Sequence, residues 1–186
     1  MSAPRVVVVM GVSGTGKSTV GALLADRLGV PYAEADAFHP PANIAKMSAG
    51  TPLDDGDRAP WLDAIGAWAR ERQRRGPGLV GVVSCSALRR RYRDRLRAAA
   101  PGLFFLHLTG DRSLVADRLA GRRDHFMPSA LLDSQYATLE PLQDDEQGTA
   151  LTITAEPGQL AGQAAAVLRR HSAPGGPGAA AHPAAG

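Results

Sequence analysis

Residues 11–18 read Gly-Val-Ser-Gly-Thr-Gly-Lys-Ser, which matches the pattern G-x-x-x-x-G-K-[ST] at every fixed position. The string directly follows the apolar run 6–10 and directly precedes a helical pattern. Glycines let the backbone curl tightly and direct several N–H groups at the oxygens of a polyphosphate. The chain is therefore predicted to bind a nucleoside triphosphate at a strand–loop–helix junction. A glycine-rich turn that only links a strand to a helix is the alternative.

The chemistry of this loop predicts individual roles. Lys17 would reach the β- and γ-phosphates, and the Ser18 hydroxyl would ligate Mg²⁺. The helix after the loop would present the positive end of its dipole to the same anion. We expect nucleotide ligands along the whole loop, namely Gly11, Ser13, Gly14, Thr15, Gly16, Lys17, Ser18 and Thr19.

Strand and helix patterns alternate along the chain. Short apolar runs predict strands at 5–10, 31–35, 79–84, 103–108 and 150–154. Helical patterns lie at 17–28, 42–48, 60–75, 87–99, 113–121, 128–140 and 158–171. Continuous apolar runs are typical of strands that are covered on both faces. The sequence therefore predicts an α/β domain in which a five-stranded parallel sheet has helices on both faces.

Length and composition restrict the domain count and the partners. The chain has 186 residues, 44% of them hydrophobic, which suits one domain over residues 1–171. Residues 172–186 are Ala, Gly and Pro with one Ser and one His, so we expect a disordered tail. The formal net charge is only +3 and the arginines are spread along the chain, so no nucleic-acid partner is expected.

The apolar stretches, the first residues and the cysteine content predict the cellular compartment. No apolar stretch reaches about 18 residues, and residues 1–5 run straight into a strand rather than a leader. Cys85 is the single cysteine, so it cannot form an internal disulfide. We expect a cytoplasmic protein without membrane contact.

Lysine is rare in this chain. Of 21 basic residues, only Lys17 and Lys46 are lysines. Because most surface positions accept either type, we expect lysine to be kept where arginine would not serve. Lys46 is therefore a candidate functional residue.

In open parallel sheets, ligands bind beyond the carboxyl ends of the strands. Asp36 follows the second strand, where it would accept the proton of an attacking hydroxyl and help to hold Mg²⁺. A turn or helix-cap aspartate is the alternative. The third predicted strand ends Val-Val-Ser-Cys-Ser at 82–86, so the usual second metal carboxylate is expected to be absent. Residues 36–62 are polar, proline-punctuated and dense in ionisable groups, which predicts a small lobe over the substrate.

Three segments resemble gluconokinases of the small P-loop type. They are residues 36–62; Cys85-Ser86-Ala87-Leu88 with Tyr92-Arg93-Asp94 and Leu96-Arg97; and His125-Phe126-Met127-Pro128 with Leu131-Leu132 and Ser134-Gln135. The resemblance extends from residue 6 to about residue 146. It implies a P-loop kinase fold similar to shikimate and nucleoside monophosphate kinases, with a substrate segment at about 36–62 and a lid at about 118–135. Ala35 and Asp124 stand where that family usually has glycine.

The resemblance also implies an activity and ligands. The activity is ATP- and Mg²⁺-dependent phosphorylation of D-gluconate to 6-phospho-D-gluconate, commonly by a homodimer. A sugar acid presents a carboxylate and a row of hydroxyls, and guanidinium forks suit a carboxylate best. The implied substrate ligands are Asp36, His39, Lys46, Arg58, Ser86, Arg93 and His125.

Arginines of the implied lid would close over the triphosphate. Arg118 and Arg122 are the candidates, and Arg122 is expected to be catalytic together with Lys17 and Asp36. Ordinary solvation on a helix is the alternative for both arginines. For Arg58 the alternative is a loop ion pair with a nearby aspartate, and for Arg93 it is an exposed position on a basic helix face.

Two other functions are open to a chain with this loop. Another small-metabolite P-loop kinase, acting on shikimate or a related sugar acid, would share the loop and Asp36. It would not explain the combination of His39, Asn43, Lys46, Met47 and the run 60–62. A nucleotide switch of the GTPase kind would need an Asn-Lys-x-Asp string, which the sequence lacks. ADP release with and without gluconate separates these classes.

Overall fold

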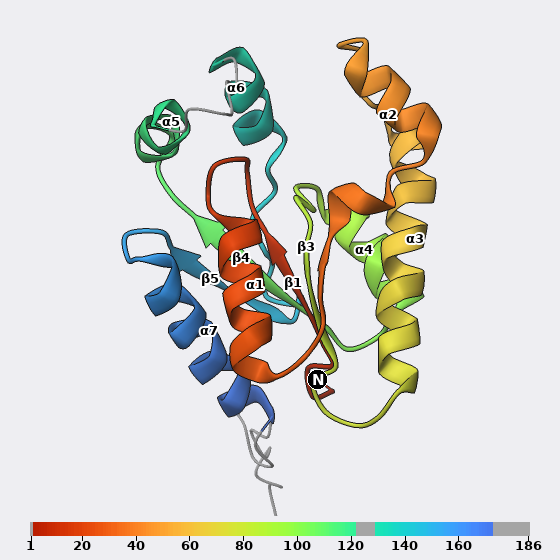
Figure 1. The fold of residues 1–186 in the computed structure, drawn as a ribbon, viewed down its shortest axis with the longest axis vertical. Helices are drawn as coiled ribbons and strands as arrows, with labels where there is room; N and C mark the ends of the chain where they lie inside the picture. The colour runs from red at the N-terminus through yellow and green to blue at the C-terminus, as the bar shows by residue number, and fades with distance from the viewer. Residues whose placement is uncertain (1, 122–128, 173–186) are drawn as a thin grey trace, which may run out of the picture.

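A computed structural model of the chain describes residues 2–121 and 129–172. In this described part, five strands form one parallel sheet at the centre of the fold (Figure 1). The order across the sheet is β2 (Tyr32–Glu34), β3 (Gly81–Ser84), β1 (Val6–Met10), β4 (Leu103–Thr109) and β5 (Gly148–Thr152). Each neighbouring pair runs parallel. The predicted five-stranded parallel sheet is confirmed.

Helices cover both faces of the sheet. Helices α1 (Lys17–Leu28) and α7 (Pro157–Ser172) lie against one face, and α3 (Asp55–Arg74) and α4 (Arg90–Ala99) lie against the other (Figure 1). Strand β1 shows why its run is continuously apolar. Val7 and Val9 belong to the core on the α1 and α7 side, and Val6 and Val8 belong to the core on the α3 and α4 side. Burial of each valine stabilises the fold by about 1.5 kcal/mol or more.

The remaining short elements lie beyond the carboxyl edge of the sheet. A 3₁₀ turn, η1 (Ala35–Phe38), leads from β2 into α2 (Pro41–Ser48), and α5 (Arg112–Ala120) and α6 (Ser129–Thr138) follow β4. In Figure 1, α2 rises on one side of this edge and α5 and α6 rise on the other. These elements surround the place where a parallel sheet binds its ligand.

Two of the described helices begin several residues away from the start that the sequence patterns predict. Helix α3 starts at Asp55 rather than at Pro60, because Asp54 and Asp57 form a reciprocal capping box. Helix α4 starts at Arg90 rather than at Ala87, because Ala87 has a φ of +44°. That left-handed conformation cannot begin a right-handed helix.

The described helices include none that is both long and apolar enough to cross a membrane. Ser172 ends α7, and the rest of the predicted tail lies outside the described residues.

Candidate active site

The phosphate loop connects β1 to α1 and has the backbone that its glycines permit. Gly11 and Gly14 have φ values of +143° and +84°. A Cβ on Gly11 would lie 2.6 Å from the carbonyl oxygen of Leu108, and one on Gly14 would lie 2.7 Å from the side chain of Leu119. Among the described residues, no side chain caps the first turn of α1. The helix N-terminus is therefore presented to an anion by backbone geometry alone.

Internal hydrogen bonds hold this loop in shape. The buried Thr15 hydroxyl donates to the Val12 carbonyl at 2.9 Å, and Lys17 Nζ donates to the same oxygen at 3.0 Å. The Lys17 side chain therefore folds over the loop that it would serve. The predicted nucleotide ligands from Gly11 to Thr19 thus form one continuous strand–loop–helix segment.

A carboxylate that the sequence analysis missed lies beside Ser18. The Ser18 hydroxyl donates to Glu34 Oε2 at 2.6 Å, and Glu34 is the last residue of β2. The usual place for a second metal carboxylate is after the third strand, which has none, and the second strand supplies it instead. The signal was a second acidic residue two positions before Asp36, at the end of the second strand.

The oxygen donors at this edge fit a small hard cation. Ser18, Glu34 and Asp36 supply a hydroxyl and carboxylates, which are the ligands that Mg²⁺ prefers. In the described part of the chain, no group of three or more His, Cys, Asp and Glu side chains is arranged to hold a metal. A cation here would take its other ligands from phosphates and water, as Mg²⁺ does in phosphoryl-transfer sites.

Asp36 lies in η1, exposed, directly beyond the carboxyl end of β2. The indole N–H of Trp61 donates to the Ala35 carbonyl at 2.7 Å and fixes this turn to α3. Ala35 is buried, and Ala87 is the one non-glycine residue with a positive φ in the described part of the chain. An alanine in place of the family's glycine is thus compatible with the turn.

The segment from η1 to α3 brings several predicted substrate residues together. The His39 ring stacks on Trp61, with centroids 4.5 Å apart and planes within 9°. The buried Asn43 amide lies 3.3 Å from His39 Nδ1 and donates to the Asp57 carbonyl at 2.8 Å. Partial burial lowers the pKa of His39, as does Arg58, while Asp36 acts to raise it. A neutral imidazole offers both a donor and an acceptor to a hydroxyl.

The two cations of this segment have different partners. Lys46 Nζ lies 2.7 Å from both carboxylate oxygens of Asp57, and this hydrogen bond raises the pKa of Lys46 and lowers that of Asp57. Arg58 donates to the Leu53 carbonyl at 2.5 Å and lies 5.8 Å from the centroid of the Tyr92 ring. The loop ion pair considered for Arg58 is therefore made by Lys46 instead. Arg58 retains further N–H groups for a ligand.

Ser86 lies in the turn between β3 and α4. Its carbonyl accepts the Gly11 N–H at 3.3 Å, and Cys85 N–H donates to the Val9 carbonyl at 3.0 Å, so the turn adjoins the phosphate loop. Burial raises the pKa of the Cys85 thiol to about 12, which suits a packing residue rather than a nucleophile. The turn thus places Ser86 at the sheet edge where the phosphate loop begins.

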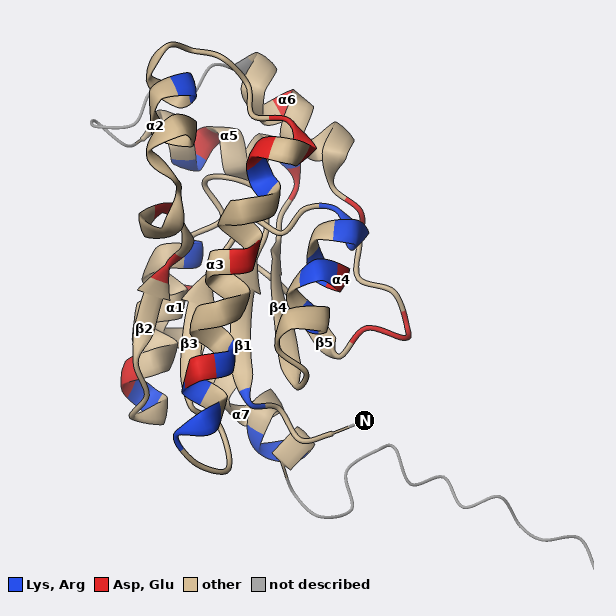
Figure 2. Cartoon of the chain, turned by 90° about the vertical axis from the view of Figure 1, so that its right-hand side faces the viewer, with Lys and Arg blue, Asp and Glu red and all other residues tan. Residues whose placement is uncertain are grey.

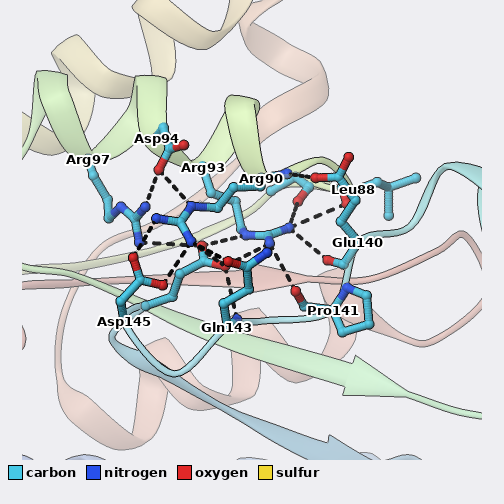
Figure 3. Close-up of polar contacts among 11 residues, drawn as sticks. Leu88, Arg90, Arg93, Asp94, Arg97, Glu140, Pro141, Gln143 and Asp145 are labelled. Atoms are coloured by element: carbon cyan, nitrogen blue, oxygen red, sulfur yellow. Dashed lines mark hydrogen bonds and ion pairs between the residues drawn. The ribbon is translucent and has the colours of Figure 1, made fainter.

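Arg93 is placed differently from the prediction. Its side chain is fully buried and makes six hydrogen bonds, bidentate to Glu146 and onward to backbone carbonyls (Figure 3). The carbonyl acceptors belong to Ala87, Leu88, Glu140 and Pro141. All five N–H groups of the guanidinium thus have protein acceptors, so we assign Arg93 to the architecture around the turn and not to the substrate.

Other arginines of α4 also pair within the protein. Figure 2 shows the basic residues of α4 close to acidic residues of α3 and of the loop before β5. Arg91 pairs with Asp55, Arg95 with Asp63, and Arg90 with Asp145. Burial acts to raise the pKa of Glu146, but the hydrogen bonds from Arg93 and from the Gln143 N–H, together with the charges of Arg93 and Arg97, lower the pKa overall. The basic run is therefore largely neutralised inside the fold.

The far side of the phosphate loop is bounded by α5 and α6. Arg118, in the last turn of α5, donates to the Ile153 carbonyl at 2.5 Å. Gln135 of α6 contacts Ser13 twice: the Ser13 N–H donates to its carbonyl oxygen at 2.7 Å, and its amide donates to Ser13 Oγ at 3.0 Å. Gln135 is a second residue to which the sequence analysis gave no role. The predicted Arg122 and His125, and the unusual Asp124, lie outside the described residues.

Comparisons with known proteins agree with this geometry. A family described as an AAA domain matches residues 6–142. A gluconokinase of Gluconobacter oxydans (strain 621H) is 54% identical over 143 residues, which cover 77% of this chain and 79% of that protein. The thermoresistant gluconokinase of Escherichia coli (strain K12) is 42% identical over 142 residues, covering 76% and 80%.

Solved structures give the same result. The crystal structure of a gluconokinase from Sinorhizobium meliloti 1021 has a TM-score of 0.82 at 46% identity, covering 92% of this chain and 95% of that one. Shikimate kinase from Aquifex aeolicus has a TM-score of 0.56 at 12% identity, covering 89% and 96%, and shares the fold alone. The P-loop kinase fold is thereby confirmed, and the chain belongs to the gluconokinase family.

Proposed function

We propose that this chain transfers the γ-phosphoryl group of ATP to D-gluconate and releases 6-phospho-D-gluconate and ADP. One observation carries the proposal: the phosphate loop follows the end of β1 and Asp36 follows the end of β2 at the same edge of the parallel sheet, and the chain then continues into the segment with His39, Lys46 and Arg58. The relatives named gluconokinases support gluconate as the acceptor.

The phosphate loop binds and orients the donor. Phosphoryl transfer requires alignment and neutralised charge rather than covalent help from the protein. The backbone N–H groups of the loop and of the first turn of α1 bind phosphate oxygens, and Lys17 leaves the Val12 carbonyl to place its charge on the transferring group. Arg118 and Arg122 are proposed to add positive charge from the opposite side, with Arg122 acting on the transition state.

Asp36 handles the proton of the acceptor. The 6-hydroxyl of gluconate attacks the γ-phosphorus, the bond to the bridging oxygen of ADP breaks, and the hydroxyl proton passes to the Asp36 carboxylate. The position of Asp36 directly beyond β2, beside the strand end that carries Glu34, supports this role. Glu34 is already engaged by Ser18, which leaves Asp36 as the carboxylate for the acceptor.

Magnesium is the proposed cation of the site. When bound, it neutralises charge on the β- and γ-phosphates. Ser18 would hold it directly, and Glu34 and Asp36 would hold it or its waters.

The sugar acid is proposed to bind the segment between η1 and α3. Lys46 and Arg58 would bind the carboxylate, and His39, Ser86 and His125 would bind hydroxyls. Lys46 already binds Asp57, so a gluconate carboxylate would join an existing ion pair. Asp57 therefore orients Lys46 for the substrate.

The proposal also includes an oligomeric state and a cellular location. We propose a homodimer, on the strength of the family resemblance, and a cytoplasmic location, since the buried thiol of Cys85 requires no oxidising compartment.

An ADP-release assay with a panel of acceptors tests the function. We expect turnover with D-gluconate and little with shikimate or other aldonates. Asp36→Asn keeps the shape of the side chain and is expected to lower kcat by about 10²–10⁴. ADP release that does not depend on gluconate would contradict the proposal, and preferred turnover of shikimate would favour the alternative kinase.

A further inference from the structure

Four short polar contacts, which share the three hydroxyl protons of Ser18, Tyr32 and Ser84, link the two ends of the proposed cation site through strands β2 and β3. The Tyr32 hydroxyl lies 2.6 Å from Glu34 Oε2 and 2.9 Å from Ser84 Oγ. Ser84 Oγ lies 2.9 Å from the Lys17 carbonyl, and the Ser18 hydroxyl lies 2.6 Å from the same Glu34 oxygen. These contacts therefore run from the Lys17 carbonyl through Ser84, Tyr32 and Glu34 to the hydroxyl of Ser18.

The direction of these bonds follows from the groups involved. A carboxylate only accepts, so both Tyr32 and Ser18 donate their hydroxyl protons to Glu34. The lone pairs of Ser18 Oγ then remain available for a cation. A tyrosine hydroxyl keeps its proton at physiological pH, so Tyr32 remains a donor.

Packing on α1 is adapted to this arrangement. A Cβ on Gly21 would lie 2.6 Å from Ser84 Oγ and 2.8 Å from Tyr32 Cε2. Helix α1 therefore has no side chain at the point where the tyrosine ring meets the serine. The tyrosine ring packs between the helix and the sheet, and this packing restricts the position of its hydroxyl group.

Glu34 needs such a partner. Its long side chain loses about 1.5–2 kcal/mol of conformational entropy when it is ordered. A single bond to Ser18 would leave the carboxylate free to follow that hydroxyl in several rotamers. A second donor from a rigid ring selects one rotamer before any nucleotide binds.

We propose that Tyr32 is a positioning residue for the cation: it holds the Glu34 carboxylate against Ser18, so that the hydroxyl of Ser18 is oriented to ligate Mg²⁺. The inference rests on the proposed use of magnesium and ATP. It predicts that the loss of the Tyr32 hydroxyl weakens nucleotide binding only when the metal is present.

Calorimetric titration with AMPPNP, in excess Mg²⁺ and in EDTA, tests this without turnover. For Tyr32→Phe we expect the Kd in EDTA to stay unchanged and the Kd in Mg²⁺ to rise by about three- to tenfold, which corresponds to one lost hydrogen bond. Tyr136→Phe is the matched control, since that hydroxyl donates to the Gly110 carbonyl instead. Its two Kd values should equal those of the wild type.

The outcomes are distinct. Equal Kd changes in Mg²⁺ and EDTA, or no change in either, would overturn the positioning role while leaving the gluconate kinase proposal intact. If the wild-type protein binds AMPPNP with the same Kd in Mg²⁺ and in EDTA, both the proposed cation site and the inference are overturned. If Tyr32→Phe does not fold, Tyr32→Met also removes the hydroxyl while keeping a flexible apolar side chain, and an unchanged ratio of its two Kd values would equally overturn the inference.

Discussion

Gln135 of α6 and Ser13 of the phosphate loop form a reciprocal pair, with the Ser13 N–H donating to the Gln135 carbonyl oxygen and the Gln135 amide donating to Ser13 Oγ. The two residues are 122 positions apart in the chain. The pair connects α6 directly to a backbone N–H of the loop that is proposed to bind the triphosphate. A change at Gln135 is therefore expected to alter the binding of the triphosphate.

Gln135→Glu tests this connection. The new carboxylate would still accept the Ser13 N–H but would add a negative charge beside the triphosphate. We expect the KM for ATP to rise about tenfold, while the KM for gluconate changes little. Gln73→Glu, which makes the same charge change at a residue bound to the Pro101 carbonyl, should leave both constants unchanged. An equal rise in the KM values for ATP and gluconate would show that Gln135→Glu does not act specifically on the triphosphate site.

Lys46 and Arg58 are expected to discriminate between the substrates. A compact ammonium and a planar fork are not interchangeable, so Lys46→Arg and Arg58→Lys should each raise the KM for gluconate by about tenfold or more, with a small effect on ATP. Steady-state kinetics at varied gluconate and varied ATP measure both constants. Variants in which ATP affinity falls as much as gluconate affinity would remove these residues from the gluconate site.

The buried pair of Arg93 and Glu146 is expected to support stability. Glu146→Gln leaves the guanidinium buried without its charge partner, which costs about 3–5 kcal/mol of unfolding free energy. Asp63→Asn makes the same chemical change in the exposed pair with Arg95 and should cost far less. Urea denaturation gives both values, and a similar cost for the two variants would show that the burial of this pair has little effect.

Much of this architecture is readable in the sequence. Helix α1 has the predicted bounds, because the loop before it and Gly29 after it are strong local signals. The start of α3 was also readable, because Asp54 and Asp57 have the spacing of a capping box, but the predicted helix began later, at Pro60.

The site residues were harder to predict where their partners are distant. Arg93 lies in a basic run that looks solvent-exposed, and only the fold reveals Glu146, 53 residues away, as its partner. The proposed role of Glu34 depends on its contact with Ser18, which forms only when β2 and α1 pack together. Local patterns determine the elements, whereas a side chain's role depends on which elements become neighbours.

His107 of β4 is expected to make stability depend on pH. Burial lowers its pKa from 6.5 to about 4, and the nearby Arg93 acts in the same direction. Between these two values the unfolded chain binds the proton and the folded protein does not, so stability falls as the pH is lowered through this range. The largest slope is about 1.4 kcal/mol per pH unit.

His107→Gln removes this contribution. The variant should show a smaller decrease in unfolding free energy between pH 6.5 and pH 4 than the wild type, measured by urea denaturation at each pH. Identical pH profiles for the two proteins would mean that His107 titrates alike in the folded and unfolded states.

Product identification by ³¹P NMR tests the central claim most directly. Wild-type protein with ATP, Mg²⁺ and D-gluconate should form 6-phospho-D-gluconate and ADP in equal amounts. Lys17→Ala should remain folded and form almost none, because neither Ser18 nor the loop backbone can supply its charge at the transferring phosphoryl. ADP formed without phosphorylated gluconate, or substantial product from Lys17→Ala, would contradict the account.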